Sequence, residues 1–156
     1  MHFKFSYNKK QIIQGLRYHF ISRREIKLMM ILVNVFAIGS AVLFYTKKIR
    51  PEPFLLGSFI WVFMMLAVWY ILPYSIYSKS STFKETFTIF LNDENIVLQN
   101  HKGEVVWKWN QFKSFFESPN FFHLYFTSKT FFLIPKDEIG DEVRHELRGL
   151  FNKHIG

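Results

Sequence analysis

The chain has 156 residues and a formal net charge of +8, and 49% of its residues are hydrophobic and 20% aromatic. This length allows one modest domain with an accessory segment. The absence of cysteine excludes disulfides, thiolate catalysis and thiolate metal sites. A mean hydropathy of only +0.05, with 21% charged residues, indicates that one very apolar part is joined to one water-facing part.

Residues 1–27 are expected to form a short strand and a basic amphipathic helix. FKFSY (3–7) alternates apolar and polar residues, and Asn8 with Gln11 resembles a helix N-cap and its capping-box partner. Two interpretations remain open for the helix: it packs on the protein's own domain, or it lies on anionic lipid. In the second case the candidate headgroup contacts are Lys9, Lys10, Arg17, Arg23, Arg24 and Lys27.

Residues 28–78 are expected to form a two-span transmembrane hairpin, with spans at 28–46 and 54–77. Both uncharged runs reach the ~20 residues that an α-helix needs to cross a bilayer. In a soluble protein two such helices would be buried, but the rest of this chain is too short to cover helices that are apolar all round. Pro73 is expected to kink or end the second span. Asn34 is the candidate polar contact between the helices.

Basic residues flank the two spans unequally. Near the span ends, nine lysines and arginines lie before the first span or just after the second, where Lys79 and Lys84 are counted, and three lie in the connecting loop. Because basic residues concentrate on the cytoplasmic side, both termini are predicted to be cytoplasmic. This bias also accounts for most of the +8 charge.

Residues 79–156 read as a β-rich domain with a C-terminal helix. Short alternating segments are broken by turn residues, and Val105, Trp107 and Trp109 are expected to share a buried face. After Pro135 an apolar stripe at helical spacing predicts a terminal helix. Five to seven antiparallel strands capped by one helix is the layout of a pleckstrin-homology-like barrel or sheet.

Residues 105–126 place nine aromatic side chains in VVWKWNQFKSFFESPNFFHLYF. A stacking platform for single-stranded nucleic acid would need a basic groove, but residues 80–156 hold nine lysines and arginines against ten acids. We therefore expect no nucleic-acid partner. Both faces of 121–126 are apolar, so one is expected to be core and the other to contact a helix, lipid or a partner. The candidate partner face is Phe121, Phe122, Tyr125 and Phe126.

No catalytic or cofactor motif is found. Glu142 and His145 stand one helical turn apart, but a carboxylate-bridged di-iron site needs that motif twice. The six histidines lack zinc-site spacing, and there is no nucleophile elbow or glycine-rich phosphate loop. We expect no catalytic residue, metal site or cofactor.

The segment GEVVWKWNQFKSFFESPNFFHLYFTSKTFFLIPKDEI resembles the YcxB-like C-terminal domain of bacterial membrane proteins. The likeness extends over essentially the whole chain and is clearest over residues 82–151. It implies a location in the bacterial cell membrane, a pleckstrin-homology-like fold and a binding or scaffolding module, and offers no catalytic residues to carry over. The matching positions are Gly103, Trp109, Glu117, the Phe121-Phe122 pair and Ile134-Pro135-Lys136.

Three functions are therefore considered. The first is a membrane-anchored, non-enzymatic binding or scaffold protein that contacts itself or a membrane protein partner. The second is a module that senses anionic lipid at the membrane surface. The third is a small membrane enzyme or transporter subunit, for which the spans offer only Asn34 as a polar group at depth.

Overall fold

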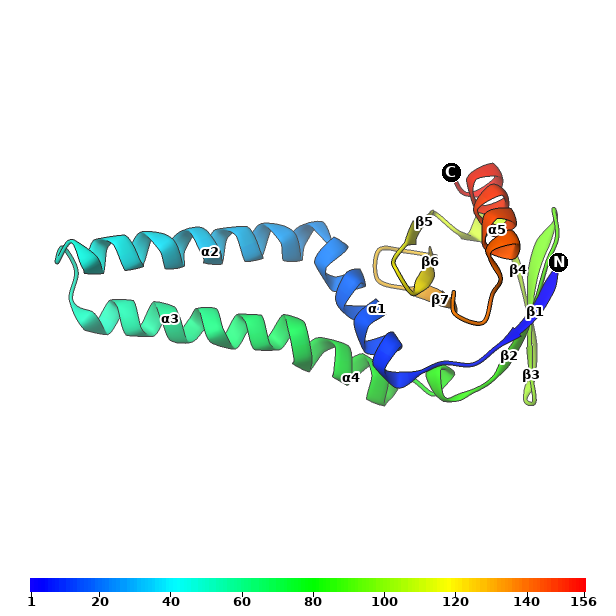
Figure 1. Ribbon diagram of the computed structural model, residues 1–156, viewed down its shortest axis with the longest axis horizontal. Coiled ribbons are helices and arrows are strands. Elements are labelled where there is room, and N and C mark those ends of the chain that lie inside the picture. The colour runs from blue at the N-terminus through cyan, green and yellow to red at the C-terminus, as the bar shows by residue number, and fades with distance from the viewer. The chain divides into compact units, whose positions relative to one another are not determined.

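The computed structural model describes all 156 residues, and Figure 1 traces the chain from the N-terminus in blue to the C-terminus in red. The helical elements are α1 (Lys9–Ser22), α2 (Arg24–Tyr45), α3 (Pro51–Leu66), the π-helical segment η1 (Ala67–Ile71), α4 (Leu72–Lys79), the 3-10 turns η2 (Thr82–Lys84) and η3 (Trp109–Gln111), and α5 (Asp141–His154). The strands are β1 (His2–Phe5), β2 (Phe87–Leu91), β3 (Asn95–Asn100), β4 (Gly103–Lys108), β5 (Ser114–Glu117), β6 (Phe121–Tyr125) and β7 (Phe131–Pro135).

The chain divides into two compact units. One comprises residues 1–15 and 80–156, and the other comprises residues 16–79. The boundary falls inside α1, so the segment 1–27 that the sequence suggested as one part is shared between the units. The first unit holds every strand, because β1 adds to the sheet that begins with β2.

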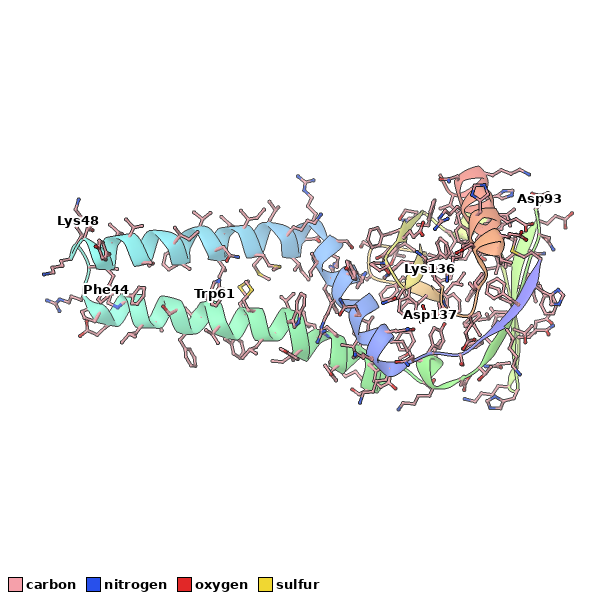
Figure 2. All side chains as sticks on the ribbon, viewed as in Figure 1. Phe44, Lys48, Trp61, Asp93, Lys136 and Asp137 are labelled. Atoms are coloured by element: carbon pink, nitrogen blue, oxygen red, sulfur yellow. The ribbon has the colours of Figure 1, made fainter.

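The second unit contains the two long apolar helices that the sequence predicts. Arg24–Tyr45 and Pro51–Lys79 are long and apolar enough to cross a membrane by length and composition. Pro51 stands at the start of α3, where its missing N–H has no role in the helix. Next to the connection that carries Lys48, Phe44 of α2 and Phe54 of α3 stack with ring centroids 4.6 Å apart (Figure 2). The second helix continues past Pro73, after the π-helical segment.

The first sheet has the antiparallel order β1-β2-β3-β4. Its strands alternate as a one-sided sheet requires: Phe87, Ile89 and Leu91 of β2 are buried, and the residues between them are partly exposed. A two-residue turn, His101-Lys102, joins β3 to β4. Gly103 follows it with φ of 152°, a backbone conformation that favours glycine.

The second sheet has the antiparallel order β5-β6-β7 and packs with α5. Phe121–Tyr125 and Phe131–Pro135 form an antiparallel hairpin as β6 and β7. Leu147 and Phe151 of α5 are fully buried in a core that includes side chains from both sheets. The antiparallel strands and the final helix are therefore confirmed.

The strands do not close into a barrel. Closure needs an unbroken ladder around the sheet, but β4 pairs only with β3, and β5 pairs only with β6. The 3-10 turn Trp109–Gln111 separates β4 from β5, so Trp109 does not continue the strand as expected. Trp109 is nevertheless buried, whereas Val105 is 48% exposed.

Candidate functional site

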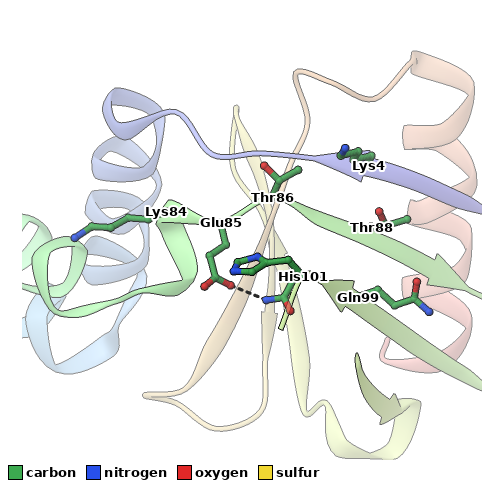
Figure 3. A pocket seen from close by; sticks show the side chains of 8 residues that line it. Lys4, Lys84, Glu85, Thr86, Thr88, Gln99 and His101 are labelled. Atoms are coloured by element: carbon green, nitrogen blue, oxygen red, sulfur yellow. Dashed lines mark hydrogen bonds between the residues drawn. The ribbon is translucent and has the colours of Figure 1, made fainter. Parts of the chain in front are cut away.

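A polar hollow of about 530 Å³ lies on the outer face of the first sheet (Figure 3). Lys4, Thr88 and Gln99 form one row across β1, β2 and β3, because each is the register partner of the next. The row arises from strand alternation, which sends these side chains away from the core. The full lining is Lys4, Lys84, Glu85, Thr86, Thr88, Gln99, Asn100 and His101.

The charge of this hollow is predominantly positive. The Glu85 carboxylate forms an ion pair with Lys102 and accepts a hydrogen bond from Asn100 Nδ2 at 2.6 Å, drawn as a dashed line in Figure 3. The hydrogen bond from Lys102 is the main cause that lowers the Glu85 pKa below its ordinary value. Lys4 and Lys84 have no acidic partner. Two ammonium groups beside hydroxyl and amide donors can bind an anionic, oxygen-rich group.

The first sheet has two edge strands, β1 and β4, and β4 is the more exposed of the two. Val105 and Val106 are 48% and 50% exposed, and of the six residues of β4 only Trp107 is better covered. An unpaired strand edge presents backbone N–H and C=O groups to any chain that can pair with it. This edge is the second surface with the chemistry to bind a partner.

An ion cluster joins β5, α5 and Lys136, the residue that follows β7. Glu117 accepts hydrogen bonds from Arg148 Nη2 at 2.7 Å and Nε at 2.9 Å, and from Lys136 Nζ at 2.6 Å. The Arg148 hydrogen bonds, followed by those of Lys136, lower the Glu117 pKa to about 2 against the opposing effect of burial. Both cations also lie over the Phe122 ring, at 5.5 Å for Lys136 and 6.0 Å for Arg148. The cluster fixes α5 on the second sheet.

Ser118 and His123 lie in hydrogen-bond contact, with Ser118 Oγ 2.9 Å from His123 Nε2. This is the geometry of a serine and its general base. Ser118 is only 3% exposed and His123 is fully buried. Both side chains are therefore shielded from solvent in this fold.

The residues proposed to contact lipid headgroups differ in their exposure. Lys9, Lys10, Arg24 and Lys27 are exposed. The Arg23 side chain is 25% exposed and lies 3.9 Å from Glu25. The Arg17 side chain contacts Trp69 and Tyr70 within its own unit. On the apolar side of α1, Ile12, Ile13, Leu16 and Phe20 are all buried.

The aromatic residues proposed as a partner face are also divided. Phe121 and Phe122 are fully buried within the chain. Phe122 packs against Phe151 of α5 on one side of β6, and Phe121 lies against Gly15 of α1. Tyr125 and Phe126 remain partly exposed. One side of β6 is thus covered by α5, and at Phe121 the other side is covered by α1 of the same chain.

Asn34 forms a hydrogen bond between the two long helices. Its Oδ1 accepts from Nε1 of Trp61, which is labelled in Figure 2, at 3.0 Å. Its Nδ2 donates to the Met30 carbonyl at 2.7 Å. The amide therefore has both a partner on α3 and a partner in its own helix. Sequence reasoning proposed Asn34 for such a contact but did not identify Trp61.

The sequence did not predict the contact between Arg17 and Trp69. Its Nε donates to the Trp69 carbonyl at 2.9 Å, and its guanidinium lies 5.0 Å from the Trp69 ring centroid and 5.3 Å from that of Tyr70. Pro73 stands four residues after Trp69 and has no N–H, so it cannot supply the usual helical donor. The signal in the sequence was Pro73, whose missing N–H removes one donor from the helix just after the π-helical segment that contains Trp69.

Together these elements define a class of protein: two helices of membrane-spanning length joined to an antiparallel β unit that ends in a helix. No curated protein and no solved structure matches the chain. Residues 91–151 match the family model described as YcxB-like protein. This segment runs from the end of β2 through most of α5, and the match confirms the resemblance found in the sequence.

Proposed function

We propose that this chain is a membrane-anchored, non-enzymatic binding or scaffold protein whose β-rich, pleckstrin-homology-like unit lies in the cytoplasm. The observation that carries the proposal is the exposure of the long helices. The most apolar 18-residue window of Arg24–Tyr45 has no buried residue, and that of Pro51–Lys79 is 11% buried. Leu32, Phe36 and Phe59 are 68%, 65% and 72% exposed. Such helices are stable when lipid covers them.

The basic residues support the orientation. Lys47, Lys48 and Arg50 occupy the short connection between the helices, and the larger group flanks the other helix ends. The positive-inside bias supports a cytoplasmic location for both termini and the β unit. The similarity of residues 91–151 to the YcxB-like family supports a bacterial membrane location for this unit.

Extraction of membranes at alkaline pH tests the anchor. The full chain is expected to stay in the membrane pellet. Val35→Arg places a charge in the middle of α2, where it costs about 3 kcal/mol, and should lower the inserted fraction. Tyr45→Arg, at the helix end, is the matched control because its side chain can reach the interface. Release of the unaltered chain into the soluble fraction would contradict the proposal.

A second candidate function is recognition of an anionic group in the polar hollow. The observation in its favour is that Lys4 and Lys84 have no acidic partner there. The ligand class is a phosphate-bearing molecule, which is either a lipid headgroup or a free phosphate ester. Of the α1 residues considered for headgroup contact, Lys9, Lys10, Arg24 and Lys27 have the exposure that this role needs.

Titrations of the detergent-solubilised full chain distinguish these sources. Inorganic phosphate and micelles that contain phosphatidylglycerol are added separately, and the amide NMR shifts of Thr88 and Gln99 are followed. Binding in the hollow predicts saturable shifts that Lys4→Gln with Lys84→Gln removes and Lys129→Gln leaves. If only Lys9→Gln with Lys10→Gln abolishes the response to micelles, the headgroup contact lies on α1. Shifts that do not saturate with either probe contradict the hollow as a site.

A further inference from the structure

The outer edge of β4 has free backbone groups at known positions. Asn92 N–H donates to the Asn95 carbonyl at 3.2 Å, which makes these two residues a hydrogen-bonded position of the β2–β3 ladder. Alternation then turns the backbone groups of Ile96 and Leu98 toward β4. Their partners in β4 are Trp107 and Val105, respectively. The N–H and C=O groups of Glu104, Val106 and Lys108 therefore point outward.

One observation confirms this assignment independently. The backbone N–H of Lys108 donates to Gln111 Oε1 at 2.9 Å, so it does not pair with β3. Gln111 protects one end of the edge and leaves its centre open. Natural sheets usually protect exposed edges with central charges, prolines or bulges. Here two half-exposed valines occupy the centre instead.

The charged residues along this edge are complementary to those of an identical strand that runs antiparallel to it. Glu104, Val106 and Lys108 share the outer face of the sheet, because their register partners are Gln99, Val97 and Asn95. An antiparallel pair of identical strands with Val106 at the two-fold axis places each Glu104 opposite a Lys108. On the inner face the same register places Val105 opposite Trp107. A shift of the register toward the hairpin turn brings Lys108 opposite Lys102, two like charges, which is unfavourable.

We propose that β4 pairs antiparallel with β4 of a second copy of this chain, with Val106 opposite Val106 and Glu104 opposite Lys108. The two first sheets then become one continuous sheet across an isologous interface. Val106 exchanges both of its backbone hydrogen bonds with its counterpart. Glu104 N–H donates to the Lys108 carbonyl of the second copy without displacing Gln111. This inference rests on the proposed binding function and names its partner.

Cysteine cross-linking of the full chain in native membranes tests the register. The chain contains no cysteine, so each introduced thiol is unique. Val106→Cys is expected to form a disulfide-linked dimer under mild oxidation, because Cα atoms of such a strand pair lie roughly 5.5 Å apart. Glu104→Cys alone should not cross-link, but it should do so when co-expressed with Lys108→Cys. Glu94→Cys, exposed in the β2–β3 turn, is the control.

Charge exchange gives a second measurement that does not depend on oxidation. Glu104→Lys and Lys108→Glu each place like charges opposite one another at both ends of the interface, and should raise the dimer dissociation constant in detergent roughly tenfold. The double exchange, and a mixture of the two single variants, should both restore dimerisation. A loss caused only by misfolding would not be restored by mixing.

Two negative results are distinguishable. If Val106→Cys cross-links no more than Glu94→Cys while both variants remain in the alkaline-washed membrane pellet, the β4 interface is wrong and the membrane anchor stands. If the chain leaves the membrane pellet, the proposed function fails.

Discussion

Arg17 Nε donates to the backbone carbonyl of Trp69 at 2.9 Å, four residues before Pro73. In an α-helix this carbonyl would accept from the N–H of residue 73, which proline lacks. The Arg17 guanidinium also lies over the Trp69 ring, 5.0 Å from its centroid. Arg17 thus compensates, from outside the helix, for the break that Pro73 makes in the hydrogen-bond ladder.

This relationship predicts that Arg17 and Pro73 are coupled. Arg17→Ala should lower the free energy of unfolding by about 0.5–1.5 kcal/mol, because the Trp69 carbonyl loses its donor. In a Pro73→Ala background the helix supplies that donor, and the loss should be smaller. Thermal unfolding of the detergent-solubilised chain, followed by circular dichroism, measures both. Equal losses in the two backgrounds would show that the carbonyl is not what Arg17 stabilises.

The Asn34–Trp61 hydrogen bond predicts coupling between the two long helices. Asn34→Ala and Trp61→Phe each remove one partner of this 3.0 Å contact. A double-mutant cycle should give an interaction energy of about 0.6–1.7 kcal/mol, the range measured for such bonds in membranes. Additive effects of the two substitutions would mean that the bond contributes nothing to the packing of the hairpin.

Gly15 and Gly149 form a matched pair of helical glycines. A Cβ at Gly15 would lie 2.7 Å from Phe121 Cδ2, whereas a Cβ at Gly149 would meet nothing within 4 Å. Gly149→Ala should therefore stabilise α5 by about 0.5–1 kcal/mol. Gly15→Ala should destabilise the chain, and Phe121→Leu should relieve part of that loss. Stabilisation by both alanines would contradict the close packing of α1 on Phe121.

Glu117 predicts a specific loss of stability in acid. Its folded pKa of about 2 lies below the ordinary 4.5, so the ionised carboxylate stabilises the fold above pH 4.5. This contribution is lost as the pH falls from 4.5 through 2. At neutral pH Glu117→Gln should lower the free energy of unfolding by about 1–3 kcal/mol, and the difference from the unaltered chain should narrow below pH 4.5.

Urea unfolding across this pH range measures the effect. Glu146→Gln, an exposed glutamate on α5, is the control and should change little. A difference for Glu117→Gln that stays constant down to pH 2 would disprove the assignment of the low pKa.

The long helices and most strands could be predicted because their signals are local. An uncharged run of membrane length predicts a helix wherever it packs, and the alternation in FTIFL places Phe87, Ile89 and Leu91 on one buried face. The prediction of a closed barrel was wrong because the closure of a sheet depends on which strands pair. Alternation in the sequence does not report that Trp109–Gln111 turns the chain away after β4.

The candidate sites were harder to predict because they depend on register and on contacts distant in sequence. Lys4 and Gln99 meet across Thr88 only through the pairing of β1, β2 and β3. The apolar pattern of 121–126 predicted that both faces of this segment are in contact with other groups. It could not reveal that Phe121 and Phe122 are covered by helices of the same chain, at Gly15 and Phe151.

The most direct test of the account is the labelling of single cysteines in intact cells with a membrane-impermeant maleimide. Lys48→Cys lies in the connection between the long helices, and Lys129→Cys lies in the turn between β6 and β7. With the hairpin spanning the membrane and both termini in the cytoplasm, Lys48→Cys is expected to be labelled from outside, and Lys129→Cys only after the cells are permeabilised. Labelling of Lys129→Cys in intact cells, or protection of both positions, would contradict a membrane-spanning hairpin with a cytoplasmic β unit.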